Sequence, residues 1–301
     1  MLAVKYISNA AIDRVLWDEC LAKSACNLIY LQSYYLDAMA DDWDAIVVNN
    51  YEAVMPLPFR KKWGIKYIYH PAFIQQLGLC STNKNISLDD ILPTIKKHFK
   101  YADLYLNYTN IGIQNAASKI NYVLKLSNPY NFYVENYKND LKKNLKRSNR
   151  EFLEYRNDNS IEETISIYKK SYGARHTSIT DNDYTNFLQL CNKLETNKKA
   201  FTRSVYDEAE NLFAIGLFLL HNNRIYNVMN TTTALGKTNA ANHFLFDKLI
   251  EEFSNSNYFL DFEGSELPGV KSFYENFYPE NEPYFYYKIN NLNPILKIFK
   301  K

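Results

Sequence analysis

The stretch from residue 257 to 289, NYFLDFEGSELPGVKSFYENFYPENEPYFYYKI, most constrains how this chain folds. Its first part, residues 258–263, alternates apolar and acidic side chains with the period of two that a strand requires. This spacing predicts a strand with Asp261 and Glu263 on one face, ended by Gly264. Two such carboxylates can serve proton transfer, or they can be solvated on an open sheet face.

A short helix should follow, because Pro268 stands where the first turn of a helix tolerates a missing N–H. That helix would carry Tyr274, and a strand at 284–289 would return. A tyrosine and two carboxylates beside a glycine-bounded turn are typical of loops that carry chemistry on a rigid scaffold.

This stretch, as LDFEGSELPGVKSFYENF, and the run MPLPFRKKWGIKYIYHPAFIQQLG at 55–78 together resemble the GNAT superfamily of acyl-CoA N-acyltransferases, close to its FemABX branch. The resemblance covers most of the chain. It implies an α/β (α+β) fold of two GNAT-like modules, each a mixed, mostly antiparallel sheet flanked by helices. We expect an N-terminal domain at 1–128 and a donor-binding, catalytic domain at 129–301.

Length and composition agree with two medium-sized domains. The chain has 301 residues, and single cores seldom exceed about 250–300 residues. Its net charge of +2 argues against a protein held on nucleic acid mainly by bulk charge. The 4 cysteines show no metal-ligand spacing and are interpreted as reduced core residues, so no metal site is expected.

No signal-peptide pattern opens the chain, and its longest apolar run, residues 212–220, is far shorter than the roughly 20 residues of a membrane helix. We therefore expect a cytoplasmic protein without membrane insertion.

The adjacent amides Gln75 and Gln76 follow an apolar segment in the first half. They either contact a substrate or cap a loop, and side-chain amides often satisfy backbone groups. Residues 134–156 predict the most basic helix, in which Lys143, Lys146, Arg147 and Arg150 share one face. Such a face is either solvated or a dock for phosphate groups. Arg175, in a loop between two predicted helices, is a further candidate for binding an anionic substrate.

The segment from Thr231 to Ala240 contains Gly236, Lys237, Thr238 and Asn239 and leads into a helix through Phe253. Glycine permits close backbone approach, and the free N–H groups of a first helical turn favour an anion. An ordinary capped helix after a glycine turn explains the same composition.

From residue 202 onward we predict three strands, a helix, a strand, a short helix and a last strand. The resemblance implies that this is a GNAT core in which residues 236–239 bind the pyrophosphate of acetyl-CoA or another acyl-CoA. The chain departs from the usual family loop, because Thr233 stands near the expected Arg or Gln and Gly236 is its one glycine. FemABX relatives take the acyl group from aminoacyl-tRNA, so the donor stays open.

The first hypothesis is an N-acyltransferase that moves an acyl group to an amine on a small molecule or cell-envelope precursor. Asp261 or Glu263 would act as the base, and Tyr274 resembles in position the acid of many GNAT enzymes. The alternatives are a FemABX-like aminoacyl-tRNA-dependent transferase acting on a peptidoglycan-type precursor, and a catalytically silent GNAT-fold binding module.

Overall fold

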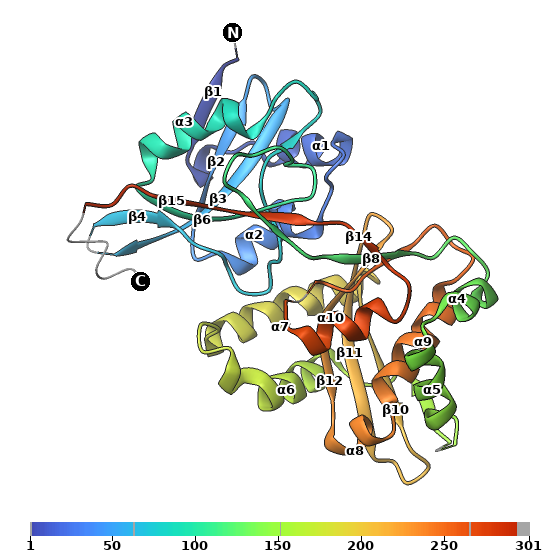
Figure 1. Ribbon diagram of the computed structural model, residues 1–301. Coiled ribbons are helices and arrows are strands. Elements are labelled where there is room, and N and C mark those ends of the chain that lie inside the picture. Colours follow the sequence, from blue (N-terminus) through green and yellow to red (C-terminus); the bar gives the residue numbers. More distant parts are fainter. Residues whose placement is uncertain (1, 63, 151, 265, 294–301) are drawn as a thin grey trace. The chain divides into compact units, whose positions relative to one another are not determined.

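The computed structural model describes residues 2–62, 64–150, 152–264 and 266–293 (Figure 1). The chain divides into two compact units: residues 1–119 with 283–301, called unit 1, and residues 120–282, called unit 2. Each unit is built around its own mixed sheet.

Unit 1 contains a sheet with the strand order β1-β2-β3-β4-β6-β15-β7, and β5 pairs with β3. The strands are β1 (Val4–Ile7), β2 (Trp43–Val48), β3 (Ala53–Lys62), β4 (Ile65–Ile68), β5 (Cys80–Ser81), β6 (Tyr101–Leu106), β7 (Ala117–Lys119) and β15 (Tyr284–Asn290). The helices are α1 (Arg14–Lys23), α2 (Ser33–Met39) and α3 (Leu88–His98).

Both faces of this sheet are covered at β2, where every residue is buried. Ile46 packs with Ile91 and Ile95 of α3 in one core cluster. Trp43 meets Trp17 of α1 at a ring-centroid distance of 5.1 Å. A strand buried on both faces should be apolar throughout, as β2 largely is.

Unit 2 contains a sheet with the strand order β14-β8-β13-β12-β11-β10-β9. The strands are β8 (Tyr122–Lys125), β9 (Glu154–Arg156), β10 (Ala200–Tyr206), β11 (Leu212–His221), β12 (Arg224–Thr232), β13 (Phe259–Asp261) and β14 (Glu280–Asn281). The helices are α4 (Tyr130–Asn136), α5 (Asn139–Ser148), α6 (Ile161–Tyr172), α7 (Asp181–Thr196), α8 (Ala234–Thr238), α9 (Ala241–Phe253) and α10 (Pro268–Glu275).

In unit 2, α6 and α7 lie on one face of the sheet, and α9 and α5 lie on the other (Figure 1). Helix α7 begins with a capping box: the Thr180 hydroxyl accepts from the Asp183 N–H, and the Asp183 carboxylate accepts from the Thr180 N–H. Helix α9 buries Phe244, Leu245 and Leu249 in the main core cluster of the unit.

Two expectations about local structure are wrong. The continuous basic helix predicted at 134–156 is instead α4, α5 and β9, with β9 paired to β10 in the sheet. Helix α4 ends at Asn136 and α5 starts again at Asn139. The strand predicted at 258–263 ends at Asp261, and Glu263 has a φ of 57°, so the two acids do not share a strand face.

The expected boundary between two domains at residues 128/129 stays a prediction. In the structure, β8 at 122–125 pairs with β13 and β14 of unit 2. The last strand, β15, pairs with β6 and β7 of unit 1. Each segment therefore belongs to the sheet that satisfies its backbone N–H and C=O groups.

Candidate active site

The sheet of unit 2 opens where β13 ends. Strand β12 pairs in parallel with β13 over three residues, from Arg224↔Phe259 to Tyr226↔Asp261. Strand β12 then continues to Thr232, and no described strand pairs with it on this side beyond Tyr226. A register shift against β11 also leaves Val228 as an extra residue. Such bulges are common beside functional sites, because they redirect side chains.

A cavity of about 800 Å³ lies beside this open part of β12. It is bordered by α6 and the turn that follows it, by β12, by residues of α8, α9 and α10, and by the loop after β13. The residues that line it include Tyr168, Tyr172, Arg175, His176, Asn227, Met229, Asn230, Lys237, Asn242, Glu263, Phe273 and Tyr274. This is the size of a small-molecule pocket.

Glu263 lines the cavity from the loop directly after β13. Removal from water destabilises the charged carboxylate, and burial raises the pKa of Glu263 to about 8. Its left-handed φ of 57° is uncommon for a residue with a side chain, and such backbone conformations cluster at functional sites. The group can therefore change charge within the physiological pH range.

Tyr274 lines the same cavity from α10. An aromatic cluster fixes its ring, with Phe262 at 4.9 Å and Phe246 at 6.2 Å between ring centroids. Burial and the nearby Glu263 carboxyl both raise the pKa of Tyr274 above its ordinary value. Its hydroxyl accepts a hydrogen bond of 3.2 Å from the amide of Asn227. The phenol therefore stays protonated and can donate a proton.

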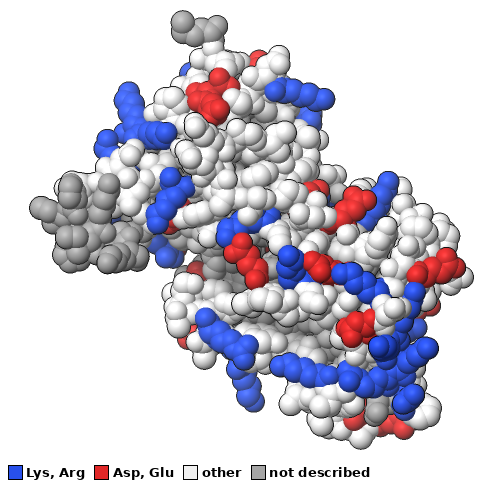
Figure 2. Space-filling model, in the orientation of Figure 1, with Lys and Arg blue, Asp and Glu red and all other residues white. Residues whose placement is uncertain are grey.

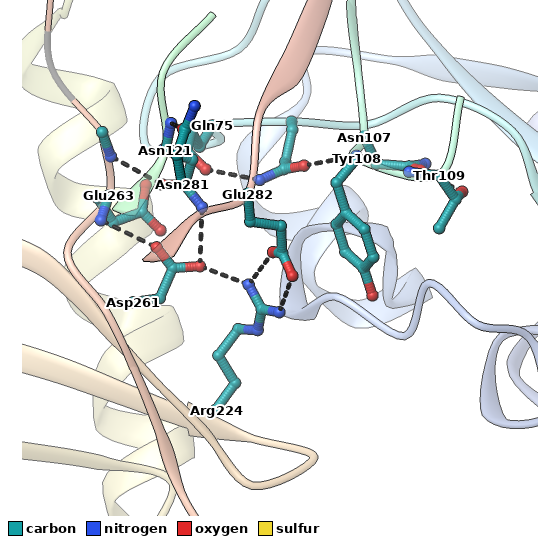
Figure 3. Close-up of polar contacts among 12 residues, drawn as sticks. Gln75, Asn107, Tyr108, Thr109, Asn121, Arg224, Asp261, Glu263, Asn281 and Glu282 are labelled. Carbon is teal, nitrogen blue, oxygen red and sulfur yellow. Dashed lines mark hydrogen bonds and ion pairs between the residues drawn. The ribbon is translucent and has the colours of Figure 1, made fainter. Parts of the chain in front are cut away.

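Asp261 has a different environment (Figure 3). Its buried carboxylate accepts from Arg224 at 2.8 Å and from the backbone N–H of Glu263 at 2.9 Å. The guanidinium of Arg224 also bonds both carboxylate oxygens of Glu282, at 2.7 and 3.2 Å. Asp261 is thus held in an ion-pair network that orients the Glu263 loop, and it is absent from the residues that line the cavity. Arg224 was not among the residues predicted from the sequence.

The predicted pyrophosphate loop is not one continuous turn. Gly236 lies in the short helix α8, where the Thr233 hydroxyl caps its N–H at 3.0 Å. The chain is left-handed at Ala240, after which α9 starts. Lys237 lines the cavity, whereas Thr238 and Asn239 do not. Ala240 has no side-chain group that could cap α9, so no side chain of the N-cap residue bonds the first N–H groups of that helix.

Gly236 has a packing role that explains why glycine stands there. A Cβ at this position would lie 2.0 Å from the carbonyl oxygen of Phe213 on β11. We expect Gly236→Ala to lower the free energy of unfolding by about 1–3 kcal/mol or more, because α8 must move off the strand. Urea unfolding measures this loss. Gly269→Ala, at a site with open space, should be close to neutral; equal losses in the two variants would contradict the packing argument.

The remaining candidates divide between the two units. Arg175 lines the cavity, with its guanidinium 5.6 Å from the ring of Tyr172. Arg147 is on α5 and Arg150 lies just after it, and both are exposed and do not line the cavity. Gln75 and Gln76 belong to unit 1.

The environment of Gln76 is that of a loop cap. Its side-chain oxygen Oε1 accepts from the backbone N–H of Tyr108 at 3.2 Å, and its side-chain nitrogen Nε2 donates to Oε1 of Gln75 at 2.7 Å. The side chain of Gln76 is fully buried.

Sequence reasoning missed the aromatic wall formed by Tyr168 and Tyr172 and the asparagines of the cavity. The tyrosines lie four residues apart on α6 and so share a helix face. The polar residues Asn227 and Asn230 interrupt an otherwise apolar strand, IYNVMN, which is the signal that marks them.

No protein-family model and no curated protein sequence matches the chain. Several solved structures share its fold. FemX has a TM-score of 0.64 at 11% identity, with 99% of this chain and 100% of FemX covered. L-PGS from Bacillus licheniformis has a TM-score of 0.53 at 12% identity, with 95% of each chain covered.

A third structure is the C-terminal domain of a putative lysylphosphatidylglycerol synthetase from Agrobacterium fabrum, with a TM-score of 0.52 at 9% identity and 96% and 95% coverage. These matches and the two mixed sheets confirm the expected fold, in which the chain consists of two GNAT-like modules.

Among the residues that the structure describes, no helix combines the length and the apolar character needed to cross a membrane. Nor do three or more His, Cys, Asp or Glu side chains of this part of the chain gather as ligands for a metal ion.

Proposed function

We propose that the chain is an acyltransferase that joins an acyl group to an amine in the cavity of unit 2. The observation that carries this proposal is the presence of Glu263, with a pKa near 8, and the protonated phenol of Tyr274 on the walls of one cavity. A base with a pKa close to the working pH is the most efficient at removing a proton in the transition state.

The reaction begins when the nitrogen of the acceptor amine attacks the carbonyl carbon of the donor. A C–N bond forms, and the ionised Glu263 carboxylate takes the proton that the nitrogen loses. When the bond between carbonyl carbon and leaving group breaks, Tyr274 gives its proton to the departing sulfur or oxygen. Arg224 and Asp261 hold the Glu263 loop in place. Alignment of two bound substrates supplies much of the acceleration.

Acyl-CoA is the first candidate donor. The start of α9 offers uncapped N–H groups, and Lys237 and Asn242 beside it line the cavity. This pair of features suits a pyrophosphate. Because Gly236 is packed against β11, we assign the phosphate contact to the backbone N–H groups of residues 241 and 242 rather than to the glycine.

A specific observation also favours aminoacyl-tRNA. Lys143, Lys146, Arg147 and Arg150 are exposed, and no described carboxylate forms an ion pair with them. Figure 2 shows Lys and Arg side chains gathered over the part of unit 2 where α5 lies. Helix α5 packs on α9, and Asn144 lies 3.4 Å from His243 in the first turn of α9. Clustered cations on one surface are the electrostatic footprint of a nucleic acid.

The two donors are separated by offering radiolabelled acetyl-CoA and radiolabelled aminoacyl-tRNA in turn, with a panel of amino acids, amino sugars and lysine-containing peptides as acceptors. We expect labelled product from one donor, and none from the Glu263→Gln variant. Turnover of neither donor, with no CoA binding up to millimolar concentration by calorimetry, would favour the silent binding module.

If aminoacyl-tRNA is the donor, the double change K143E/K146E should raise its KM at least about tenfold at low salt and flatten the salt dependence, because two phosphate contacts are lost. Initial rates at several salt concentrations measure this. The matched control is K96E/K97E on α3, where two exposed lysines lie in unit 1. If both double variants changed KM and its salt dependence equally, α5 would not be part of the tRNA-binding surface.

A further inference from the structure

Three asparagine side chains of the cavity carry buried atoms that lack a hydrogen-bond partner among the described residues. They are Oδ1 of Asn227, Nδ2 of Asn230 and Oδ1 of Asn242. All three residues line the cavity, Asn227 and Asn230 from β12 and Asn242 from the first turn of α9. Buried polar atoms are nearly always bonded, so three exceptions around one cavity require an explanation.

The bulge in β12 explains how two of these asparagines reach the same wall. Residues i and i+3 of a regular strand point to opposite faces. Here Phe218 pairs with Asn227 and Leu217 with Met229, so Val228 is an extra residue and the alternation shifts by one. Asn227 and Asn230 consequently border the same cavity. The bulge at Val228 thus brings the side-chain amides of Asn227 and Asn230 to the same cavity.

We propose that Asn227, Asn230 and Asn242 form the recognition face of this cavity, and that it binds an uncharged part of the substrate that both donates and accepts hydrogen bonds. The two side-chain carbonyl oxygens can accept hydrogen bonds, and the one amide nitrogen can donate. A substrate group with N–H or O–H donors and one acceptor therefore matches these three atoms. A plain alkyl chain would leave all three atoms unsatisfied. The inference rests on the proposed function in assigning this ligand to the transfer reaction.

Asn227 has a second role, as a positioning residue for Tyr274. It is 5% exposed, and its Nδ2 donates to the Tyr274 hydroxyl at 3.2 Å. Because the phenol oxygen accepts this bond, the phenol proton is directed to another acceptor, the leaving group. A ligand bound at Oδ1 fixes the same amide and therefore the phenol. Substrate recognition and proton donation are linked through one side chain.

The first test needs no activity. Leucine matches the shape of asparagine, so Asn230→Leu and Asn242→Leu remove an unpartnered polar atom without leaving a cavity. We expect the midpoint of thermal unfolding to stay equal or to rise by about 1–4 °C. The control is Asn121→Leu, where a fully buried amide accepts from the N–H of Gly264 at 2.8 Å; its midpoint should fall. A similar fall in all three variants would make these asparagines structural and overturn the proposal.

The second test uses the transfer assay with acetyl-CoA or aminoacyl-tRNA. Asn230→Leu and Asn242→Leu should raise KM about tenfold with a smaller effect on kcat. Asn227→Leu should lower kcat, and N227L/Y274F should be no slower than Y274F alone, because Asn227 acts through the phenol. Multiplied losses in the double variant would refute the positioning role. If the unchanged protein uses neither donor, the proposed function fails, while the thermal comparison still decides the recognition face.

Discussion

Glu263→Gln is expected to lower kcat by about 10²–10⁴-fold, since a positioned base contributes a factor of that size. The carboxylate accepts a proton only when it is ionised, so the kcat of the unchanged protein should rise with pH and level off above about 8, where Glu263 is charged. The variant should lose this rise. Initial rates between pH 6 and 10 measure it.

The exposed Glu162 of α6 gives a matched control, and Glu162→Gln should keep both the rate and the pH profile. A Glu263→Gln variant that retained a kcat within a few-fold of normal would remove this residue from the chemistry. The fold would be unaffected by that result.

The same carboxyl makes stability depend on pH. The folded chain holds the Glu263 proton up to about pH 8, whereas the unfolded chain releases it near its ordinary pKa of 4.5. Between these values the folded state binds more protons, so the free energy of unfolding should fall as pH rises, by at most about 1.4 kcal/mol per pH unit from this group. Glu263→Gln should flatten that part of the stability curve.

Arg224→Met should cause the largest loss of stability, about 3–5 kcal/mol, because it leaves the buried carboxylate of Asp261 without its cation. The Asp261 side chain is 1% exposed and that of Arg224 12%. Denaturant unfolding measures the loss. Transfer activity should fall as well, since the Glu263 loop bonds to Asp261 through its backbone N–H.

Arg156→Met is the control, because Arg156 also joins two carboxylates, those of Glu154 and Glu210. Those carboxylates are 60% and 68% exposed, so water replaces the lost cation and only a small loss is expected. Equal losses in the two arginine variants would show that burial of Asp261 does not set the cost.

Local patterns in the sequence predicted much of the fold. The helix expected to run through Phe253 is α9, which ends at that residue. The prediction of one basic helix at 134–156 was wrong. The charged residues keep helical spacing across the break between α4 and α5, so their pattern does not reveal the break. Pairing of β9 with β10 depends on a partner about 50 residues away, which local propensity does not contain.

The candidate site shows the same division. Glu263 and Tyr274 are close in sequence and both line the cavity, although the period-two pattern wrongly placed Glu263 on a strand face with Asp261. The partner of Asp261 is Arg224, 37 residues earlier and on a parallel neighbour. The spacing of residues in the sequence does not show which two charged side chains will be buried together. The paired residues of two strands become known only when their register is known.

The position of β15 determines the order in which the chain can be completed. This strand lies between β6 and β7 in unit 1, although the whole of unit 2 precedes it in the sequence. During synthesis from the N-terminus, unit 2 therefore leaves the ribosome before the sheet of unit 1 has its full set of strands. Until residues 284–290 emerge, β6 presents open backbone groups to solvent, and a protein truncated before Pro283 would keep that edge permanently.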